Sequence, residues 1–393
     1  MSNPSCSFEI SPLRPRFNVS FSHASATRSR GASLWVVLRD EQGGFGVGEG
    51  CPRSYVTGET LETALAWARE MAPQVARNDL ASFRQWRREA APQITRNPAA
   101  WCALELAHLD WFARRQGVTL ETLLGVPDVV GSHQFTAVVG GGSAGSLRRN
   151  TRAYLMGGFR SFKIKLTGDL TRDQQRMAAL RDLCAPLGIE PPRLDANNLW
   201  PDPDTALRYL DALPWRPAAI EEPLREGGPK ALSRIARTYP VVLDEALCSY
   251  TDLERHLSHP GEWIPNLRVS KLGGVLESIA LAQACEAASV PFIVGGHVGE
   301  TSLMTRAALT VARSAKGCLA QEGGFGVILL RWEPVTPAVM FGHGGRLEVG
   351  GPASAGWGMV PRSYGWARAS SWVTTIRGLW RILVTRRPWR VAL

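Results

Sequence analysis

Two lysines two positions apart, in the apolar run FKIKL, are the first residues whose type and spacing suggest chemistry. The chain has 393 residues and 45 Lys and Arg together, yet only five are lysine, and two of these are Lys163 and Lys165. A desolvated lysine can lose its proton, whereas arginine cannot. Because alternate side chains of a strand share a face, Phe162, Ile164 and Leu166 would pack outward and both lysines would face the interior. The pair predicts a site that needs a neutral amine.

Carboxylates occur in the next three apolar runs along the chain. They are Asp195 in PPRLDAN, Glu221 in AAIEEP and Asp244 in PVVLDEA. Buried ammonium groups are costly unless carboxylates lie nearby, and three converging carboxylates repel one another unless a cation joins them. Oxygen ligands favour Mg²⁺ over zinc, with Mn²⁺ as the alternative ion. The pattern predicts a metal site beside the two lysines.

A third lysine, Lys271 in LRVSKLGG, follows a later apolar run. It lies four runs on from Lys165, which is halfway around a ring of eight strands. The two amines would then flank a substrate from opposite sides. One would remove a proton α to a carboxylate, and the other would return a proton or stabilise charge. The predicted chemistry is proton abstraction through an enolate.

Short apolar runs at a nearly regular interval must position these side chains. Eight such runs recur from about residue 130, most of them roughly 25 to 30 residues apart with helical stretches between, which is about the length of one strand-helix unit. We therefore expect an α/β fold with a (β/α)8-type (modified TIM) barrel over residues 129–330, and polar side chains at the C-terminal strand ends. A doubly wound open sheet is the competing architecture, and the count of eight favours the barrel.

The regions on either side of the barrel have other patterns. Residues 1–128 predict an α+β capping domain, because SLWVVLRDEQGGFGVGEG has the pattern of two strands and PAAWCALELAHLDWFARRQG that of a helix. Residues 331–360 are predicted to return to this cap. Residues 361–393 form a basic tail rich in Trp and Arg, which we expect to be disordered or to form an amphipathic helix.

The composition argues against several classes of protein. Residues 361–393 hold seven arginines and no acid, which leaves +3 of the net charge of +10 for the rest and argues against nucleic-acid binding. No apolar run is long enough for a membrane span, and the start lacks a secretion signal. Seven separated cysteines are typical of reduced thiols. We expect a cytoplasmic homo-oligomer with a small carboxylate substrate, and weak membrane contact through the tail as the alternative partner.

Together these motifs resemble the enolase superfamily, and most closely its muconate-lactonizing-enzyme subgroup. FKIKL is similar to the KxK motif of that family, LDANNLW, IEEP and LDEA to its metal-binding strands, and VSKLGG to its second catalytic lysine; the likeness covers residues 1 to about 350. The resemblance implies roles for six residues: Mg²⁺ ligands at Asp195, Glu221 and Asp244, an acid/base pair at Lys165 and Lys271, and a supporting lysine at Lys163.

The resemblance also implies residues that contact the substrate or orient the other groups. Dipeptide epimerases of this subgroup carry Asp-x-Asp after strand eight, where this chain has QEGGFG with one acid to replace it. Arginines of the cap loops are candidates to bind a second carboxylate. The full set is Asn197, Glu300, His297, Glu322, Thr136, Arg28 and Arg53.

We therefore predict a Mg²⁺-dependent isomerase that abstracts a proton α to a carboxylate. Racemisation or epimerisation of an amino acid derivative or dipeptide ranks first, muconate-type cycloisomerisation second, and elimination of the o-succinylbenzoate-synthase type third. Two opposed lysines permit all three, because the reactions share an enolate and differ in its fate. The alternative from another class is an inactive barrel that serves as a membrane-binding or protein-binding scaffold.

Overall fold

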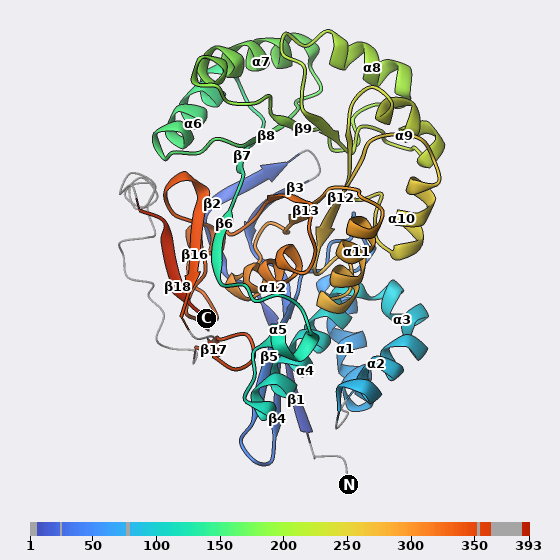
Figure 1. Ribbon diagram of the computed structural model, residues 1–393, viewed down its shortest axis with the longest axis vertical. Coiled ribbons are helices and arrows are strands. Elements are labelled where there is room, and N and C mark those ends of the chain that lie inside the picture. Colours follow the sequence, from blue (N-terminus) through green and yellow to red (C-terminus); the bar gives the residue numbers. More distant parts are fainter. Residues whose placement is uncertain (1–5, 24–25, 76–78, 352–353, 363–386) are drawn as a thin grey trace.

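A curled parallel sheet with helices outside it forms the larger part of the molecule, and an antiparallel sheet with its own helices forms the cap (Figure 1). The computed structural model describes residues 6–23, 26–75, 79–351, 354–362 and 387–393. No helix in these ranges is long and apolar enough to cross a membrane.

Eight parallel strands follow one another around the larger sheet in chain order. They are β7 (Ala137–Val139), β8 (Phe162–Lys165), β9 (Arg193–Asp195), β10 (Ala219–Glu221), β11 (Val241–Leu243), β12 (Trp263–Arg268), β13 (Phe292–Gly295) and β14 (Cys318–Gln321). The backbone N–H of Thr136 donates to the carbonyl of Gln321 at 2.9 Å, which joins the first strand to the last. The predicted barrel is confirmed, and the doubly wound open sheet is excluded.

Helices cover the outside of this barrel. They are α6 (Ala144–Met156), α7 (Leu170–Cys184) with the 3-10 turn η1 (Ala185–Leu187), α8 (Pro203–Asp211), α9 (Pro229–Ala236), α10 (Tyr250–Leu257), α11 (Val275–Ala287) and α12 (Ser302–Arg313). After β14 the chain forms only the short α13 (Gly326–Leu329). Five of these helices have an N-cap residue whose side chain accepts a backbone N–H of the first turn and so satisfies an unpaired donor: Ser143, Asp169, Asp202, Ser249 and Thr301.

The alternation of side chains along the strands separates the barrel interior from the helix-facing surface. Ile164, Leu194 and Ile220 face the helices and belong to the main core. The interior holds a second small core of Ala219, Val242, Ile264, Ile293 and Ala320. Interior side chains between this small core and the C-terminal ends of the strands can therefore be polar and face the barrel mouth.

The cap is a three-stranded sheet against which one long helix packs closely. The sheet has the order β1 (Cys6–Leu13), β4 (Ser33–Asp40), β5 (Phe45–Gly50), and the helices are α1 (Leu61–Val75), α2 (Leu80–Glu89), α3 (Ala91–Arg96), α4 (Pro98–Gln116) and α5 (Leu120–Leu124). Alternate glycines of FGVGEG make this packing possible, because a Cβ at Gly46, Gly48 or Gly50 would lie about 2 Å from a backbone oxygen of α4.

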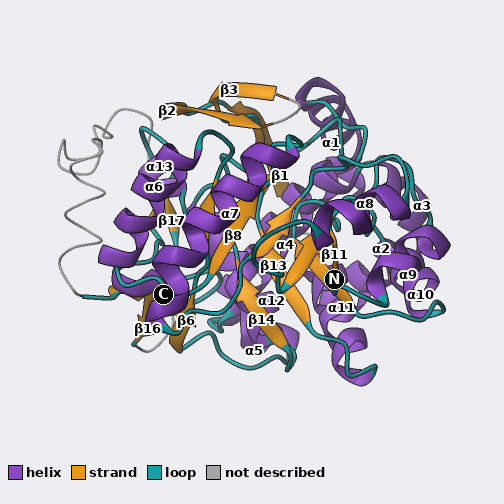
Figure 2. Ribbon diagram, turned by 90° about the horizontal axis from the view of Figure 1, so that it is seen from above, coloured by secondary structure: helices purple, strands orange, loops and turns teal. Residues whose placement is uncertain are grey.

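A two-stranded ribbon, β2 (Arg16–His23) and β3 (Ala26–Arg30), reaches from the cap over the barrel (Figure 2). The amide of Asn18 donates to the carbonyl of Ile328 at 2.7 Å, and Phe17 pairs with Leu330. The ribbon therefore holds α13 and the loop after β14 in place at the barrel mouth.

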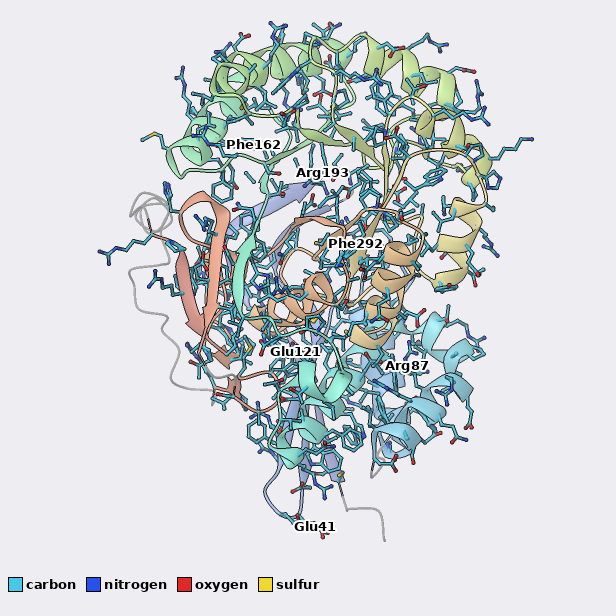
Figure 3. The ribbon with its side chains drawn as sticks, viewed as in Figure 1. Glu41, Arg87, Glu121, Phe162, Arg193 and Phe292 are labelled. Atoms are coloured by element: carbon cyan, nitrogen blue, oxygen red, sulfur yellow. The ribbon has the colours of Figure 1, made fainter. Side chains whose placement is uncertain are left out.

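Buried ion pairs join the cap to the barrel. Glu121 of α5, labelled in Figure 3, accepts two hydrogen bonds from Arg306 of α12 at 2.8 and 2.9 Å. Arg87 of α2 contacts Glu277 of α11 at 2.6 Å. Because such pairs are costly to break in a buried setting, they fix how the cap sits on the barrel.

The last part of the chain adds two small sheets. β15 (Val335–Thr336) pairs with β17 (Val360–Pro361), and after the 3-10 turn η2 (His343–Gly345) the strand β16 (Arg346–Gly350) lies between β6 (Gly131–Gln134) and β18 (Trp389–Ala392). Residues 363–386, which include the expected amphipathic stripe, lie outside the described residues. Residues 387–393 contain the strand β18, and the expectation for the rest of the tail stays a prediction.

Candidate active site

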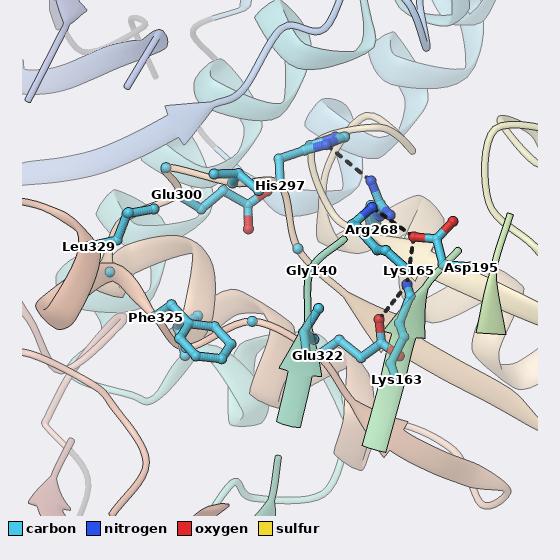
Figure 4. A pocket seen from close by; sticks show the side chains of 18 of the residues that line it. Gly140, Lys163, Lys165, Asp195, Arg268, His297, Glu300, Glu322, Phe325 and Leu329 are labelled. Atoms are coloured by element: carbon cyan, nitrogen blue, oxygen red, sulfur yellow. Dashed lines mark hydrogen bonds and ion pairs between the residues drawn. The ribbon is translucent and has the colours of Figure 1, made fainter. Parts of the chain in front are cut away.

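A cavity of about 550 Å³ lies at the C-terminal ends of the barrel strands. One side is apolar and is lined by Tyr154, Val298, Phe325, Leu329 and Phe341. The other side carries the charged groups, which Figure 4 shows converging from several strands: Lys163, Lys165, Asp195, Arg268, Glu300 and Glu322. The cavity thus combines a surface for an apolar group with ionic groups that can hold and react with a charged one.

Lys165, the last residue of β8, points into the cavity and is partly exposed. Its Nζ lies 2.8 Å from Asp195 Oδ2 and 2.9 Å from Asn197 Oδ1. Asn197 has a left-handed backbone (φ 46°), and its N–H donates to Asp195 Oδ1 at 3.1 Å. Asn readily adopts this conformation, so the turn after β9 holds both oxygens on the lysine. The structure brings these three predicted residues together.

Lys163 lies deeper, among carboxylates. Its Nζ is 2.6 Å from Glu221, 2.8 Å from Glu322 and 3.7 Å from Asp195. Burial alone would lower the pKa of Lys163, but the three carboxylates outweigh it and hold this pKa above its ordinary value. Lys163 therefore stays charged and serves as a counter-ion, not as a base.

The three predicted metal ligands end adjacent strands and share two cations. Lys163 lies within 4 Å of Asp195 and Glu221, while Arg268 contacts Asp244 and lies 3.7 Å from Glu221. Burial raises the pKa of Glu221 well above its ordinary value, and the carboxylates of Asp195 and Asp244 raise it further despite Lys163. In contrast, Arg268 holds the pKa of Asp244 below its ordinary value against burial. Glu221 is thus the acid with too little positive charge around it.

This donor set fits a divalent cation in its chemistry. The described residues contain no preassembled group of three or more acid, His or Cys side chains around one point. Lys163 and Arg268 instead bridge the acids in pairs, and Glu221 belongs to both pairs. All three acids therefore face one region. An ion with oxygen-only ligands, such as Mg²⁺, would supply the charge that Glu221 lacks.

Lys271 does not face the cavity, so its predicted position opposite Lys165 is wrong. Its side chain is 0% exposed, and its Nζ donates to the carbonyl oxygens of Asp244 at 2.5 Å and Asn266 at 3.0 Å. The residue lies three positions beyond the end of β12, in the turn before α11. Strand alternation no longer decides its direction there. Lys271 ties the end of β11 to β12.

Arg268 takes the place that was predicted for Lys271. It is the last residue of β12, four strands from β8 in the ring of eight, and its side chain lines the cavity. Burial would lower the pKa of Arg268, but Asp244, Glu245 and Glu221 raise it, so the guanidinium stays charged. The sequence analysis missed this residue. Alternation within WIPNLR, with Asn266 and Arg268 on the interior face, could have identified it.

Glu322 is fully engaged by two cations. Its Oε2 lies 2.8 Å from Lys163 and its Oε1 lies 2.9 Å from Arg193, which also donates to Thr136 Oγ1 at 3.0 Å. Despite burial, Lys163 and Arg193 lower the pKa of Glu322 to about 2. Its carboxylate is therefore ionised but already paired. Thr136 stands behind this pair and is outside the cavity lining.

The remaining predicted residues fall into different places. Glu300 and His297, in the loop after β13, line the cavity. Arg53 is 2% exposed and donates to the carbonyl of Val298 at 2.7 Å, so it joins the cap to that loop and does not line the cavity. Arg28 belongs to β3, but its side chain lies outside what the structure describes.

Comparison with known proteins places both parts of the chain in described families. Residues 146–364 match the family described as "Enolase C-terminal domain-like". Residues 9–125 match "Mandelate racemase / muconate lactonizing enzyme, N-terminal domain".

Individual relatives are distant but cover most of the chain. A hydrophobic dipeptide epimerase of Enterococcus faecalis is 26% identical over 344 residues, which are 86% of this chain and 94% of that protein. An N-succinyl-L-Arg/Lys racemase of Bacillus cereus is 25% identical over 318 residues, which are 78% and 82% of the two chains. The crystal structure of N-succinyl Arg/Lys racemase from the same species has a TM-score of 0.79 at 20% identity, with 92% and 96% coverage, and shows a shared fold.

Proposed function

Because the chain belongs to the mandelate racemase/muconate lactonizing enzyme family of the enolase superfamily, we propose that it is a Mg²⁺-dependent racemase or epimerase. Its reaction removes the proton α to the carboxylate of an amino acid derivative or a dipeptide. The relatives named above are a dipeptide epimerase and an N-succinyl amino acid racemase. The observation that carries the proposal is Lys165, whose amine lies at the cavity beside Asp195 and Asn197.

Lys165 is the proposed base. In its neutral form it takes the proton from the α-carbon and becomes an ammonium group. Asp195 and Asn197 accept hydrogen bonds from that ammonium group and hold its direction. Lys163 stays charged below it and keeps positive charge near the reacting carboxylate.

Asp195, Glu221 and Asp244 are the residues that would hold Mg²⁺. When bound, the ion would stabilise the negative charge that develops on the substrate carboxylate as the α-proton leaves. Lys271 supports this site from behind, because its contacts with the backbone and side chain of Asp244 fix that carboxylate.

The cavity walls support an N-acylated substrate with an apolar portion. Phe325, Leu329 and Phe341 supply an apolar wall. Glu322 could have bound a free amino group, but Lys163 and Arg193 already occupy both its oxygens. We therefore rank N-acyl amino acids ahead of dipeptides with a free amino terminus.

A second candidate is favoured by Arg268. Because arginine does not act as a base near neutral pH, the group opposite Lys165 suits a reaction that needs only one base. Cycloisomerisation and β-elimination are reactions of this kind.

The test is exchange of the substrate α-proton in D₂O, followed by proton NMR over a library of N-acyl amino acids and dipeptides. Lys165→Arg should keep the charge and the fold and lower exchange by about 10³-fold or more, and removal of Mg²⁺ with EDTA should stop it. Lys230→Arg is the matched control, because Lys230 is exposed on α9. Exchange that survives in Lys165→Arg, or that ignores EDTA, would reject the proposal.

A further inference from the structure

Inversion at an α-carbon needs a proton-transfer group on each face of that carbon. Lys165 can serve one face. On the other side Arg268 carries a guanidinium, which does not lose its proton near neutral pH, and the amine of Lys271 is buried against two backbone carbonyls. Another residue of the cavity must then carry the second proton.

Glu300 has the geometry for this task. It lies in the loop between β13 and α12, three strands from β8 around the ring and next to β12, and it lines the cavity. Figure 4 shows its carboxylate directed into the cavity, between the side chains of Arg268 and Leu329. Among the described residues its Oε1 is buried without a hydrogen-bond partner. A Cβ at Gly296 would lie 2.7 Å from its Oε2, so glycine there leaves room for the carboxylate.

The surroundings of Glu300 let it exist in both protonation states near neutral pH. Burial, with a smaller contribution from the neighbouring Glu49 of the cap, raises the pKa of Glu300 to about 8. A hydrogen bond from the backbone of His297 to the carboxylate and the charges of Arg53 and Arg268 act in the opposite direction. A group with a pKa near the working pH can act as an acid in one direction and as a base in the other.

We propose that Glu300 is the second proton-transfer residue, acting on the face of the α-carbon opposite Lys165. This inference rests on the proposed racemase or epimerase function. Lys165 takes the α-proton, and the C–H bonding pair stays on the substrate as the enolate. The O–H bond of Glu300 then breaks and a C–H bond forms on the other face. Lys165 ends as an ammonium and Glu300 as a carboxylate, and proton exchange with water resets both. The opposite enantiomer uses the same groups in reverse.

His297 and Glu245 also line the cavity and serve as comparison variants. His297 Nδ1 lies 3.4 Å from a guanidinium nitrogen of Arg268, which engages this ring nitrogen. Glu245 is next to Asp244 and therefore adjacent to the proposed metal site. Glu245 Oε2 is also buried without a hydrogen-bond partner among the described residues, so this residue is tested beside Glu300.

The experiment follows each enantiomer separately in D₂O with the Mg²⁺-loaded protein, by proton NMR for exchange and chiral chromatography for inversion. Glu300→Gln should still exchange the α-proton of the enantiomer that faces Lys165, within about tenfold of the unmodified chain, with retained configuration. Inversion should fall by about 100-fold or more. Glu300→Asp should recover part of the inversion, which separates loss of the acid from misfolding.

Several outcomes would overturn the inference. The first is that Glu300→Gln inverts the substrate at nearly the rate of the unmodified chain. The second is that a folded Glu300→Gln protein loses both exchange and inversion. The third is that inversion is lost on replacing His297 or Glu245 but not on replacing Glu300. Exchange of a single enantiomer without inversion by the unmodified chain would also overturn it, and would favour the one-base reactions. No exchange with any substrate would reject the proposed function itself.

Discussion

Lys165 and Arg268 face the cavity from opposite parts of the barrel, and they differ in whether they can lose a proton. Lys165 has a neutral form that can accept the α-proton, whereas Arg268 is a permanent charge. Arg268 also contacts Asp244 and lies 3.7 Å from Glu221. Arg268 thus pairs with Asp244 and lies near Glu221, and its positive charge opposes the binding of a second cation such as Mg²⁺ at the same acids.

Replacing Arg268 by methionine should therefore tighten Mg²⁺ binding. The change keeps much of the side-chain volume, releases Asp244 and Glu221, and removes a positive charge beside the ion, so we expect the dissociation constant to fall by about tenfold or more. Isothermal titration calorimetry of the metal-free protein measures it. Arg193→Met is the matched control, because Arg193 pairs with Glu322. Equal affinity in the Arg268 variant and the unmodified chain would contradict this account.

The residue types of the site could be predicted from the sequence, but not every position. Lys163, Lys165, Asp195 and Glu221 lie within or at the ends of strands, where period-two alternation fixes the face that each side chain occupies. Lys271 lies beyond a strand end, where the turn geometry sets its direction. Pairing such as that of Glu322 with Arg193 depends on residues 129 positions apart, and no local pattern contains it.

At the scale of elements, the regular interval of apolar runs was sufficient to predict the barrel, since each strand-helix unit needs a similar length of chain. The cap was predicted from the pattern of two strands in SLWVVLRDEQGGFGVGEG and of a helix in PAAWCALELAHLDWFARRQG. The position of residues 387–393 was not predictable in this way, because β18 pairs in parallel with β16 across about 40 residues of sequence. The run WRVA is too short for its own sequence pattern to predict a strand.

Leu393 gives a direct test of how these residues dock. Its side chain is 2% exposed, and its carbonyl accepts the N–H of Ser354 at 2.9 Å. Leu393→Ala should lower the free energy of unfolding by about 2–5 kcal/mol, measured by urea denaturation, because it leaves a cavity beneath the 354–358 loop. Arg390→Ala, at an exposed position of the same strand, should have little effect. If both variants were as stable as the unmodified chain, β18 would not pack as described.

For the whole molecule, the joint between cap and barrel is held in part by carboxyl groups that resist ionisation. Burial raises the pKa of Glu49 to about 7 and that of Glu333 to about 8. Glu49 of β5 accepts a hydrogen bond from Thr301 Oγ1 at 2.5 Å, and Glu333 accepts the N–H of Ser302 at 2.9 Å, so both bind the start of α12. Glu300 lies one residue before that helix cap. The cap, the joint and the proposed second acid are therefore electrostatically coupled.

This coupling predicts that stability falls as pH rises through the neutral range. Because the pKa of Glu49 is near 7 in the folded chain and 4.5 ordinarily, the folded state holds a proton that the unfolded state has lost. The contribution of this proton to the free energy of unfolding is fully present below about pH 4.5 and is lost as the pH approaches and passes 7. The change is about 3 kcal/mol.

Glu49→Gln should keep the hydrogen bond from Thr301 and remove this part of the pH dependence. Thermal unfolding midpoints between pH 5 and 8.5, measured with EDTA so that metal binding stays constant, should fall less steeply in this variant than in the unmodified chain. Glu62→Gln is the control, since Glu62 belongs to the same cap but its side chain is 71% exposed, and it should leave the slope unchanged. Parallel curves for Glu49→Gln and the unmodified chain would show that Glu49 is ionised in the folded state, and that the joint does not depend on its proton.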